Sequence, residues 1–175
     1  NFFLHFVDCE KLPSGNTAKN IKLNGVRDIG GIAGSASGTV SIINCTAKGI
    51  IEATSIRETA NIGGILGGSS ATLTMTNCRN MVDIVAPVTN VGKVGGLIGT
   101  ITSGSTTITT SYNSGNINVS SSNATPYAGG LVGSASASLT ISNSFNNANI
   151  EAACTTNSPY AAGLVGNSSS SLTIL

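Results

Sequence analysis

One short phrase recurs along this 175-residue chain at almost constant spacing, and it limits the folds open to the chain. The phrase consists of an apolar residue, a pair that is Gly-Gly in all copies but the last, two more apolar residues and a final glycine. Its five copies are Ile29–Gly34, Ile62–Gly67, Val94–Gly99, Ala128–Gly133 and Ala161–Gly166. Steady periods of about 20–50 residues mark repeat architectures, in which each unit packs only against its neighbours. The sequence therefore predicts a solenoid of stacked coils.

Apolar residues at every second position follow each copy of the phrase, as in strands with one buried face. Two inward-facing ladders are predicted: Val40, Leu73, Thr106, Leu139 and Leu172; and Ile42, Met75, Ile108, Ile141 and Ile174. A further alternating stretch contributes Ile51 with Ala53, Ile84 with Ala86, Ile117 with Val119, and Ile150 with Ala152. We predict an all-β parallel β-helix, or β-solenoid, with three short strands per coil of about 33 residues, about five coils and essentially no helix. The third copy has one extra residue, so a bulge is expected beside Thr106.

The repeat boundaries divide the chain into 29–61, 62–93, 94–127, 128–160 and a partial repeat, 161–175. Residues 1–28 are predicted to form an incomplete coil that caps the N-terminal end. In that segment Leu4, Phe6, Asp8 and Cys9 stand in the same order and spacing as Val40, Ile42, Asn44 and Cys45 of the next coil. Because the chain starts without Met and stops inside a repeat, we interpret it as a piece of a longer protein.

Charge is scarce, which excludes several function classes. Charged residues make up 9% of the chain, against about 25% in ordinary globular proteins. A net charge of +1 gives no electrostatic basis for binding nucleic acid or an anionic membrane. No run of apolar residues is long enough to span a bilayer, so this segment is not expected to insert into a membrane.

The residues that carry most enzyme chemistry are few and dispersed. The one histidine is His5, and the seven acids are Asp8, Glu10, Asp28, Glu52, Glu58, Asp83 and Glu151. Glycan-cleaving β-helices need clustered carboxylates or calcium sites, and no such cluster is expected here. We predict no catalytic residue, no metal site and no cofactor.

Four cysteines leave two alternatives open. Cys45 and Cys78 occupy the same place in successive repeats and are expected to stack, with Cys9 extending the column. They are either buried thiols that pack as small apolar groups, or a trio that contains one disulfide. Cys154 is a spare thiol or an intermolecular link.

Four Asn-x-Ser/Thr sequons, at Asn44, Asn118, Asn123 and Asn167, are candidate glycosylation sites. Asn123, beside Thr125 and Pro126 in a predicted loop, is the strongest of them. Asn44 also shares its repeat position with Asp8, Asn77 and Asn143, which suggests a side-chain ladder at a corner.

Hydroxyl side chains recur on the outward side of the second strand. The predicted face includes Thr74, Thr76, Thr107, Thr109, Thr140 and Ser142. One interpretation is that Thr simply favours exposed strands. The alternative is a flat recognition face for ice or glycan, or a surface for lateral packing between fibres.

Two segments in the later repeats resemble the GLUG-motif repeat family. The Gly-Gly-Leu-Val-Gly phrase is followed by a strand and then by Asn-Ser-Phe-Asn at 143–146, or by Thr-Ser-Tyr-Asn at 110–113. The resemblance covers residues 29–175. It implies a non-catalytic repeat of large secreted and surface proteins, including adhesin-like ones.

The resemblance and the composition together predict a structural or adhesive module, extracellular or at a cell surface, that acts as a stalk or a filament building block. Its expected partners are protein, through end-to-end self-association or further repeats of the same chain, or a glycan.

Overall fold

The computed structural model describes residues 3–7, 21–24, 28–54 and 59–175. Every helix or strand in that part of the chain is a β-strand, and all of the strand pairings are parallel. The chain completes about four turns of a β-solenoid, and β19, β20 and β21 form part of a fifth. The predicted all-β parallel fold, without helix in the described residues, is confirmed.

Three parallel sheets run along the solenoid. The nine-stranded sheet contains β1 (Phe3–Val7), β4 (Ala33–Ile43), β7 (Leu66–Thr76), β10 (Ile98–Ile101), β11 (Ser105–Thr109), β15 (Val132–Ala135), β16 (Ser138–Ser142), β20 (Val165–Ser168) and β21 (Leu172–Ile174). The seven-stranded sheet contains β2 (Ile21–Asn24), β5 (Thr46–Thr54), β8 (Arg79–Val88), β12 (Tyr112–Asn113), β13 (Ile117–Ser121), β17 (Phe145–Asn146) and β18 (Ile150–Cys154). The five-stranded sheet contains β3 (Asp28–Gly30), β6 (Ala60–Gly63), β9 (Gly92–Gly95), β14 (Tyr127–Gly129) and β19 (Tyr160–Ala162).

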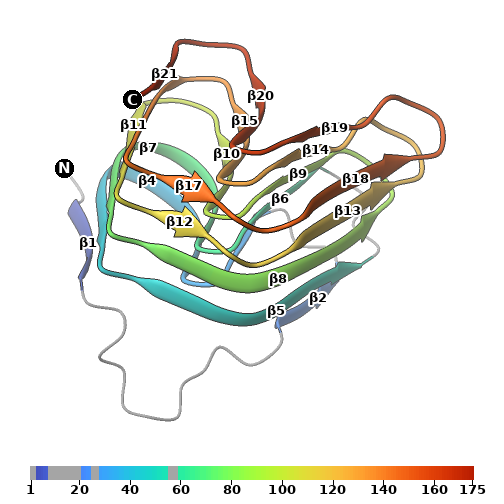
Figure 1. Cartoon of the computed structure of the whole chain (residues 1–175), viewed down its shortest axis with the longest axis horizontal. Helices are drawn as coiled ribbons and strands as arrows, with labels where there is room; N and C mark the ends of the chain where they lie inside the picture. The colour runs from blue at the N-terminus through green and yellow to red at the C-terminus, as the bar shows by residue number, and fades with distance from the viewer. Residues whose placement is uncertain (1–2, 8–20, 25–27, 55–58) are drawn as a thin grey trace.

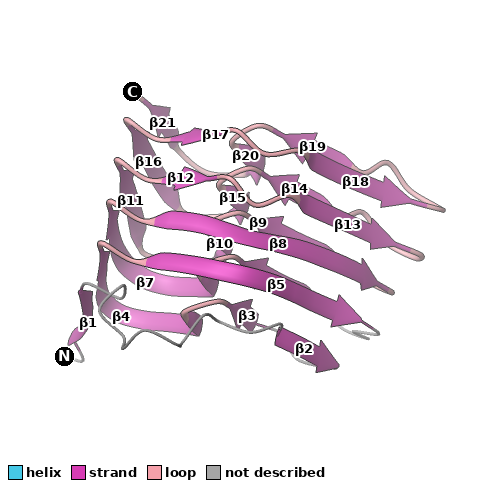
Figure 2. Cartoon of the chain, turned by 60° about the horizontal axis from the view of Figure 1, so that its bottom comes forward, coloured by secondary structure: helices cyan, strands magenta, loops and turns pink. Residues whose placement is uncertain are grey.

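The coil outline is two-lobed rather than round. In Figure 1 the seven-stranded sheet forms the base, and the five-stranded sheet meets β10, β15 and β20 at an inward-pointing corner. Figure 2 shows β5, β8, β13 and β18 lying side by side, so the coils stack from β2 upward to β18. The inward corner gives the solenoid a re-entrant side between the five-stranded and nine-stranded sheets.

The repeated glycine phrase forms this corner. Each copy ends a strand of the five-stranded sheet and begins a strand of the nine-stranded sheet, as β9 and β10 do. A Cβ on Gly95 would lie 2.6 Å from the Gly133 nitrogen and 2.8 Å from the Leu131 oxygen. Glycine is required because the backbone of the next coil occupies the place of the side chain.

The predicted inward ladders are present. Thr106 pairs with Leu73 below and Leu139 above, and Ile108 pairs with Met75 and Ile141. All six side chains are buried. The extra residue of the third coil is taken up in the bend 102–104, where Gly104 has a φ of +76°. Before the bend Ile101 pairs with Ala135, 34 residues on, and after it Ser105 pairs with Ser138, 33 residues on. Two apolar columns therefore run through these coils, and the hydroxyl of Thr106 interrupts one of them.

Asparagine ladders add a polar component to the interior. Asn80, Asn113 and Asn146 stand on successive coils; the Nδ2 of Asn80 donates to the Oδ1 of Asn113 at 2.7 Å, and the Nδ2 of Asn113 to that of Asn146 at 2.8 Å. The Asn113 amide also caps its own turn, through Gly115 O at 2.9 Å and Gly115 N at 3.1 Å. Each buried amide is thus bonded both to its own coil and to the adjacent one.

A second Asn column lies at the corner before the seven-stranded sheet, where the sequence predicts a ladder. Asn44, Asn77 and Asn143 have φ values of 55°, 50° and 48°, and Thr110 has 51°. Asparagine tolerates this left-handed backbone conformation better than most residues do. The Nδ2 of Asn77 donates to the Oδ1 of Asn44 at 2.8 Å, so this corner is also linked between coils.

Candidate functional site

The Ser/Thr face is an in-register array on the outer side of the nine-stranded sheet. Thr107 pairs with Thr74 and Thr140, and Thr109 pairs with Thr76 and Ser142. Thr74 is exposed and the other five are partly exposed. The Ser142 hydroxyl donates to Thr109 Oγ1 at 3.3 Å, so part of the face bonds to itself. The array offers regularly spaced hydroxyl groups but no charged group.

The four sequons lie in different environments. Asn123 is exposed in the loop between β13 and β14. Asn118 is exposed on β13, where its Nδ2 donates to Glu151 Oε2 at 3.2 Å. Asn167 donates to Ser134 Oγ at 3.4 Å, and Asn44 accepts from Asn77. Asn123 therefore presents its side-chain amide most openly of the four.

The cysteines of the stacked column are in different chemical states. Cys45 is disulfide-bonded, whereas Cys78 is a buried free thiol. Ser111 and Ser144 continue the same column, and the Cys78 backbone N–H donates to Ser111 Oγ at 3.0 Å. The third member of the predicted trio, Cys9, lies outside the described residues. Burial raises the pKa of the Cys78 thiol, against hydrogen bonds from Cys45 and Thr76, which lower it.

Cys154, at the end of β18, is a free thiol in a different setting. Desolvation acts to raise the pKa of this thiol, but hydrogen bonds from the backbone of Thr156 and Asn157 outweigh it, and the pKa is lowered. The thiol also contacts Ala124 O at 3.2 Å, one coil below. Cys154 is thus the more acidic of the two free thiols.

The described acidic side chains tie neighbouring coils together. Asp28 Oδ1 accepts from Asn61 Nδ2 at 2.7 Å, and Asp83 Oδ1 accepts from the Asn116 backbone N–H at 2.8 Å. Among the described residues, no three His, Cys, Asp or Glu side chains gather as metal ligands would. The side chains of His5, Asp8, Glu10 and Glu58 lie outside the described part of the structure. Asp28, Asp83 and Glu151 thus each bond to an amide group of an adjacent coil.

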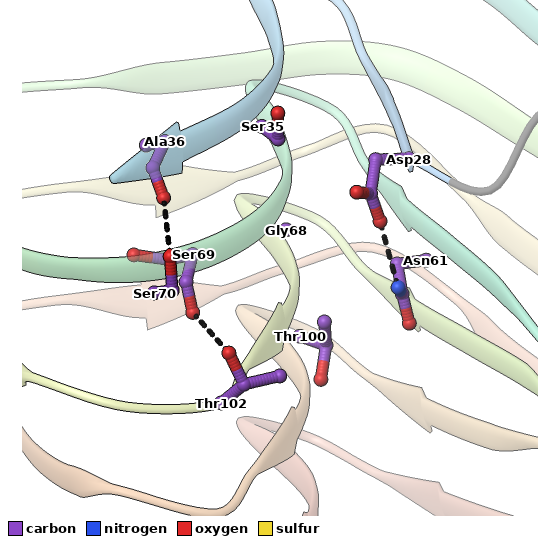
Figure 3. A pocket seen from close by; sticks show the side chains of 9 residues that line it. All are labelled: Asp28, Ser35, Ala36, Asn61, Gly68, Ser69, Ser70, Thr100 and Thr102. Atoms are coloured by element: carbon purple, nitrogen blue, oxygen red, sulfur yellow. Dashed lines mark hydrogen bonds between the residues drawn. The ribbon is translucent and has the colours of Figure 1, made fainter.

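A polar hollow of about 270 Å³ opens on the re-entrant side of the solenoid. Asp28 and Asn61, from the five-stranded sheet, face Ser35, Gly68, Ser69 and Thr100 from the nine-stranded sheet. In Figure 3 the oxygen atoms of Asn61 and Thr100 point in the same direction from facing walls. Asn61 Oδ1 and Thr100 Oγ1 are buried and have no hydrogen-bond partner. Such atoms are rare in folded proteins, because each one costs free energy.

The wall of the hollow formed by the five-stranded sheet continues upward as a column of polar and aromatic residues. Asp28, Asn61, Lys93, Tyr127 and Tyr160 are in register along that sheet. The two tyrosine rings stack with their centroids 5.4 Å apart. A second stack, Tyr112 on Phe145 with centroids 5.1 Å apart, lies on the seven-stranded sheet, with the Arg79 guanidinium over Tyr112. Aromatic side chains are few in this chain, and four of them stand in these two columns.

Sequence reasoning found the Ser/Thr face but missed the hollow and the Asn80 ladder. The hollow depends on the direction of the bend at the glycine phrase, which the spacing of the repeats does not specify. The ladder could have been recognised in the sequence, because it contains asparagines at the same position of successive repeats: Asn80, Asn113 and Asn146.

No helix in the described part of the chain is long and apolar enough to span a membrane. The parallel sheets and their repeat place the chain in the class of parallel β-solenoids. Comparison with protein-family models, curated proteins and solved structures found no match to this chain.

Proposed function

We propose that this chain is a non-catalytic structural or adhesive module of an extracellular or cell-surface protein, acting as a stalk or a filament building block. One observation carries the proposal. The interior is linked along the solenoid axis by side-chain hydrogen bonds, with the buried Asn80–Asn113–Asn146 ladder as the clearest case. A protein that transmits force or holds a spacing along one axis gains from bonds of this kind, because parallel ladders resist bending and separation together.

Composition and sequence resemblance support the same proposal. The resemblance to GLUG-motif repeats points to large secreted and surface proteins, in which such repeats are not the catalytic part. The scarcity of charge leaves the apolar core and the amide ladders as the main sources of stability. An extracellular location follows from the resemblance, and the Asn-x-Ser/Thr sequons are compatible with it.

Stretching single molecules between the two ends tests the proposal. The solenoid is expected to unfold in steps of one or more coils, at forces well above those that extend an unstructured linker. The Asn113→Ala protein is expected to unfold at lower force, and Asn147→Ala, on an exposed site, at the wild-type force. Extension without force peaks would contradict a load-bearing role. Electron microscopy separates the two versions of the proposal, because only a filament subunit forms end-to-end assemblies.

The Ser/Thr face supports a second candidate function, a recognition surface for ice or glycan. The in-register columns Thr74–Thr107–Thr140 and Thr76–Thr109–Ser142 are the observation in its favour. Thermal hysteresis of the protein solution measures ice binding, and a glycan array measures sugar binding. Replacing Thr107 and Thr140 by Tyr is expected to abolish either activity. Equal activity of the wild-type and the double variant would exclude this face.

A further inference from the structure

The re-entrant side of the solenoid combines three features that are found together in ligand sites. It is concave, it has polar groups on two facing walls, and it contains buried polar atoms without partners. We propose that this side is a binding groove for a linear, uncharged glycan. The groove is distinct from the Ser/Thr face, and the proposal holds whether or not the module acts as a stalk.

The unpartnered oxygens define what a ligand must supply. Asn61 Oδ1 is an amide oxygen and can only accept hydrogen bonds. The amide nitrogen of Asn61 is directed at Asp28 Oδ1, 2.7 Å away, which fixes the orientation of the amide. Thr100, which is 2% exposed, can both donate and accept through its hydroxyl. Both oxygens are covered, so a ligand would meet them only after a side-chain rotation. A sugar hydroxyl donates and accepts from one atom, and therefore matches both partners.

The charge of the hollow argues against a metal ion as its natural ligand. Among the residues that the structure describes, Asp28 is the only carboxylate that lines the hollow, and one of its oxygens already accepts from Asn61. Calcium takes about 6–8 oxygen ligands, usually with several carboxylates among them. Ser35, Ser69 and Thr100 instead provide neutral hydroxyl groups, which suit hydrogen bonding to a polyhydroxylated molecule.

The repeat of the groove suits a chain of sugars rather than a single one. Above Asn61 the same wall presents Lys93, Tyr127 and Tyr160 at successive coils. On the other wall Ser134 and Asn167 follow Thr100 in register. Coils are separated by about 4.8 Å, close to the length of one sugar ring along an extended polysaccharide. Each sugar would therefore meet a new pair of wall residues.

The aromatic end of the column supplies the apolar part of such a site. Tyr160 is 52% exposed, and its ring stacks on Tyr127 below. Tyrosine offers an apolar ring face and a polar hydroxyl, the combination that an amphipathic sugar ring requires. This wall is thus polar at Asp28 and Asn61, beside the hollow, and aromatic at Tyr127 and Tyr160, with Lys93 between.

Titration calorimetry with cellohexaose, xylohexaose and maltohexaose tests the proposal on the whole chain. At least one hexasaccharide is expected to bind, in the presence of EDTA as well as of calcium. Thr100→Val keeps the shape of the side chain and removes only the hydroxyl, and Asn61→Ala removes the acceptor. Each substitution is expected to weaken binding at least about fivefold, which is the loss of affinity expected when one hydrogen bond is removed. Tyr160→Ala, at an exposed site, is a third variant that leaves the core intact.

Matched controls separate the groove from other surfaces. Thr107→Val removes a hydroxyl from the Ser/Thr face, and Asn116→Ala removes an exposed amide on the seven-stranded sheet's side of the coil; neither is expected to change the affinity. Absence of binding to all three hexasaccharides would overturn the proposal. So would binding that EDTA abolishes, or binding that is lost in Thr107→Val and retained in Thr100→Val. None of these outcomes bears on the force measurement, so the groove and the structural role can fail separately.

Discussion

The Nδ2 of Asn80 donates a hydrogen bond to the Oδ1 of Asn113, 2.7 Å away on the next coil. Both side chains are 0% exposed. The bond joins equivalent positions of consecutive coils inside the protein, and each amide also closes a turn in its own coil. Stacking and turn geometry are therefore coupled through one residue type.

Asn113→Ala is expected to lower the free energy of unfolding by about 2–4 kcal/mol, because it leaves buried partners unsatisfied on three coils and opens a small cavity. Urea titration followed by circular dichroism measures the change. Asn147→Ala, at an exposed asparagine of the next coil, is the control and is expected to change it by less than about 0.5 kcal/mol. Equal effects of the two substitutions would show that the ladder adds nothing to stability.

Gly96→Ala and Gly163→Ala form a matched pair at the same place in the repeat. A Cβ on Gly96 would lie 2.7 Å from the Asn113 Cβ and would collide with the backbone oxygen of Gly130, whereas a Cβ on Gly163 meets nothing within 4 Å. Gly96→Ala is expected to destabilise the fold by about 3 kcal/mol or more, since both neighbours are held in place. Gly163→Ala is expected to be nearly neutral. Thermal unfolding of the two proteins compares them, and similar melting temperatures would contradict the close packing at this corner.

Thr106→Val is expected to stabilise the protein. Thr106 is 1% exposed between Leu73 and Leu139, and its hydroxyl oxygen has no hydrogen-bond partner. Valine has nearly the same shape and removes the unsatisfied group, which favours the folded state by about 1 kcal/mol. Thr107→Val, on the outer side of the same strand, is the control for strand propensity. A loss of stability in Thr106→Val alone would mean that the hydroxyl is bonded in solution.

The two free thiols are expected to react differently with iodoacetamide. Cys154 should be alkylated in the native protein, with a rate–pH profile shifted below that of the unfolded chain, because its pKa is lowered and the thiolate is the reactive form. Cys78 should react only after unfolding, because it is buried and burial raises its pKa. Mass spectrometry of tryptic peptides identifies the modified residue. Rapid labelling of Cys78 in the native protein would contradict this prediction, because it would show that the reagent reaches the interior at this residue.

The fold was predictable because its determinants are periodic. Residues such as Leu73 and Leu139 are equivalent by sequence spacing alone, and parallel stacking converts that spacing into contact. The bend at Gly95 and Gly96 was not predictable, because the glycines that permit it are equally compatible with close approach along a straight strand. The hollow beside Thr100 follows from that bend, and so it could not be inferred before the bend was known.

The columns of charged and aromatic side chains also could not be predicted from the sequence. The alignment of Asn61 with Lys93 and Tyr127 is a consequence of register, and the repeat spacing does not fix that register because it ranges from 32 to 34 residues. A shift of one residue would direct these side chains to the opposite face of the strand. From the sequence alone, the face of the strand on which a side chain lies could be assigned only beside a buried apolar residue such as Ile62.

The central claim is that side chains one repeat apart lie directly above one another, and methyl NOE spectroscopy tests it most directly. The account predicts cross-peaks between Met75 and Ile108 and between Ile108 and Ile141, one coil apart at about 4.8 Å, and a much weaker signal between Met75 and Ile141, about twice as far apart. The absence of both strong cross-peaks, with contacts instead among residues close in sequence, would contradict it.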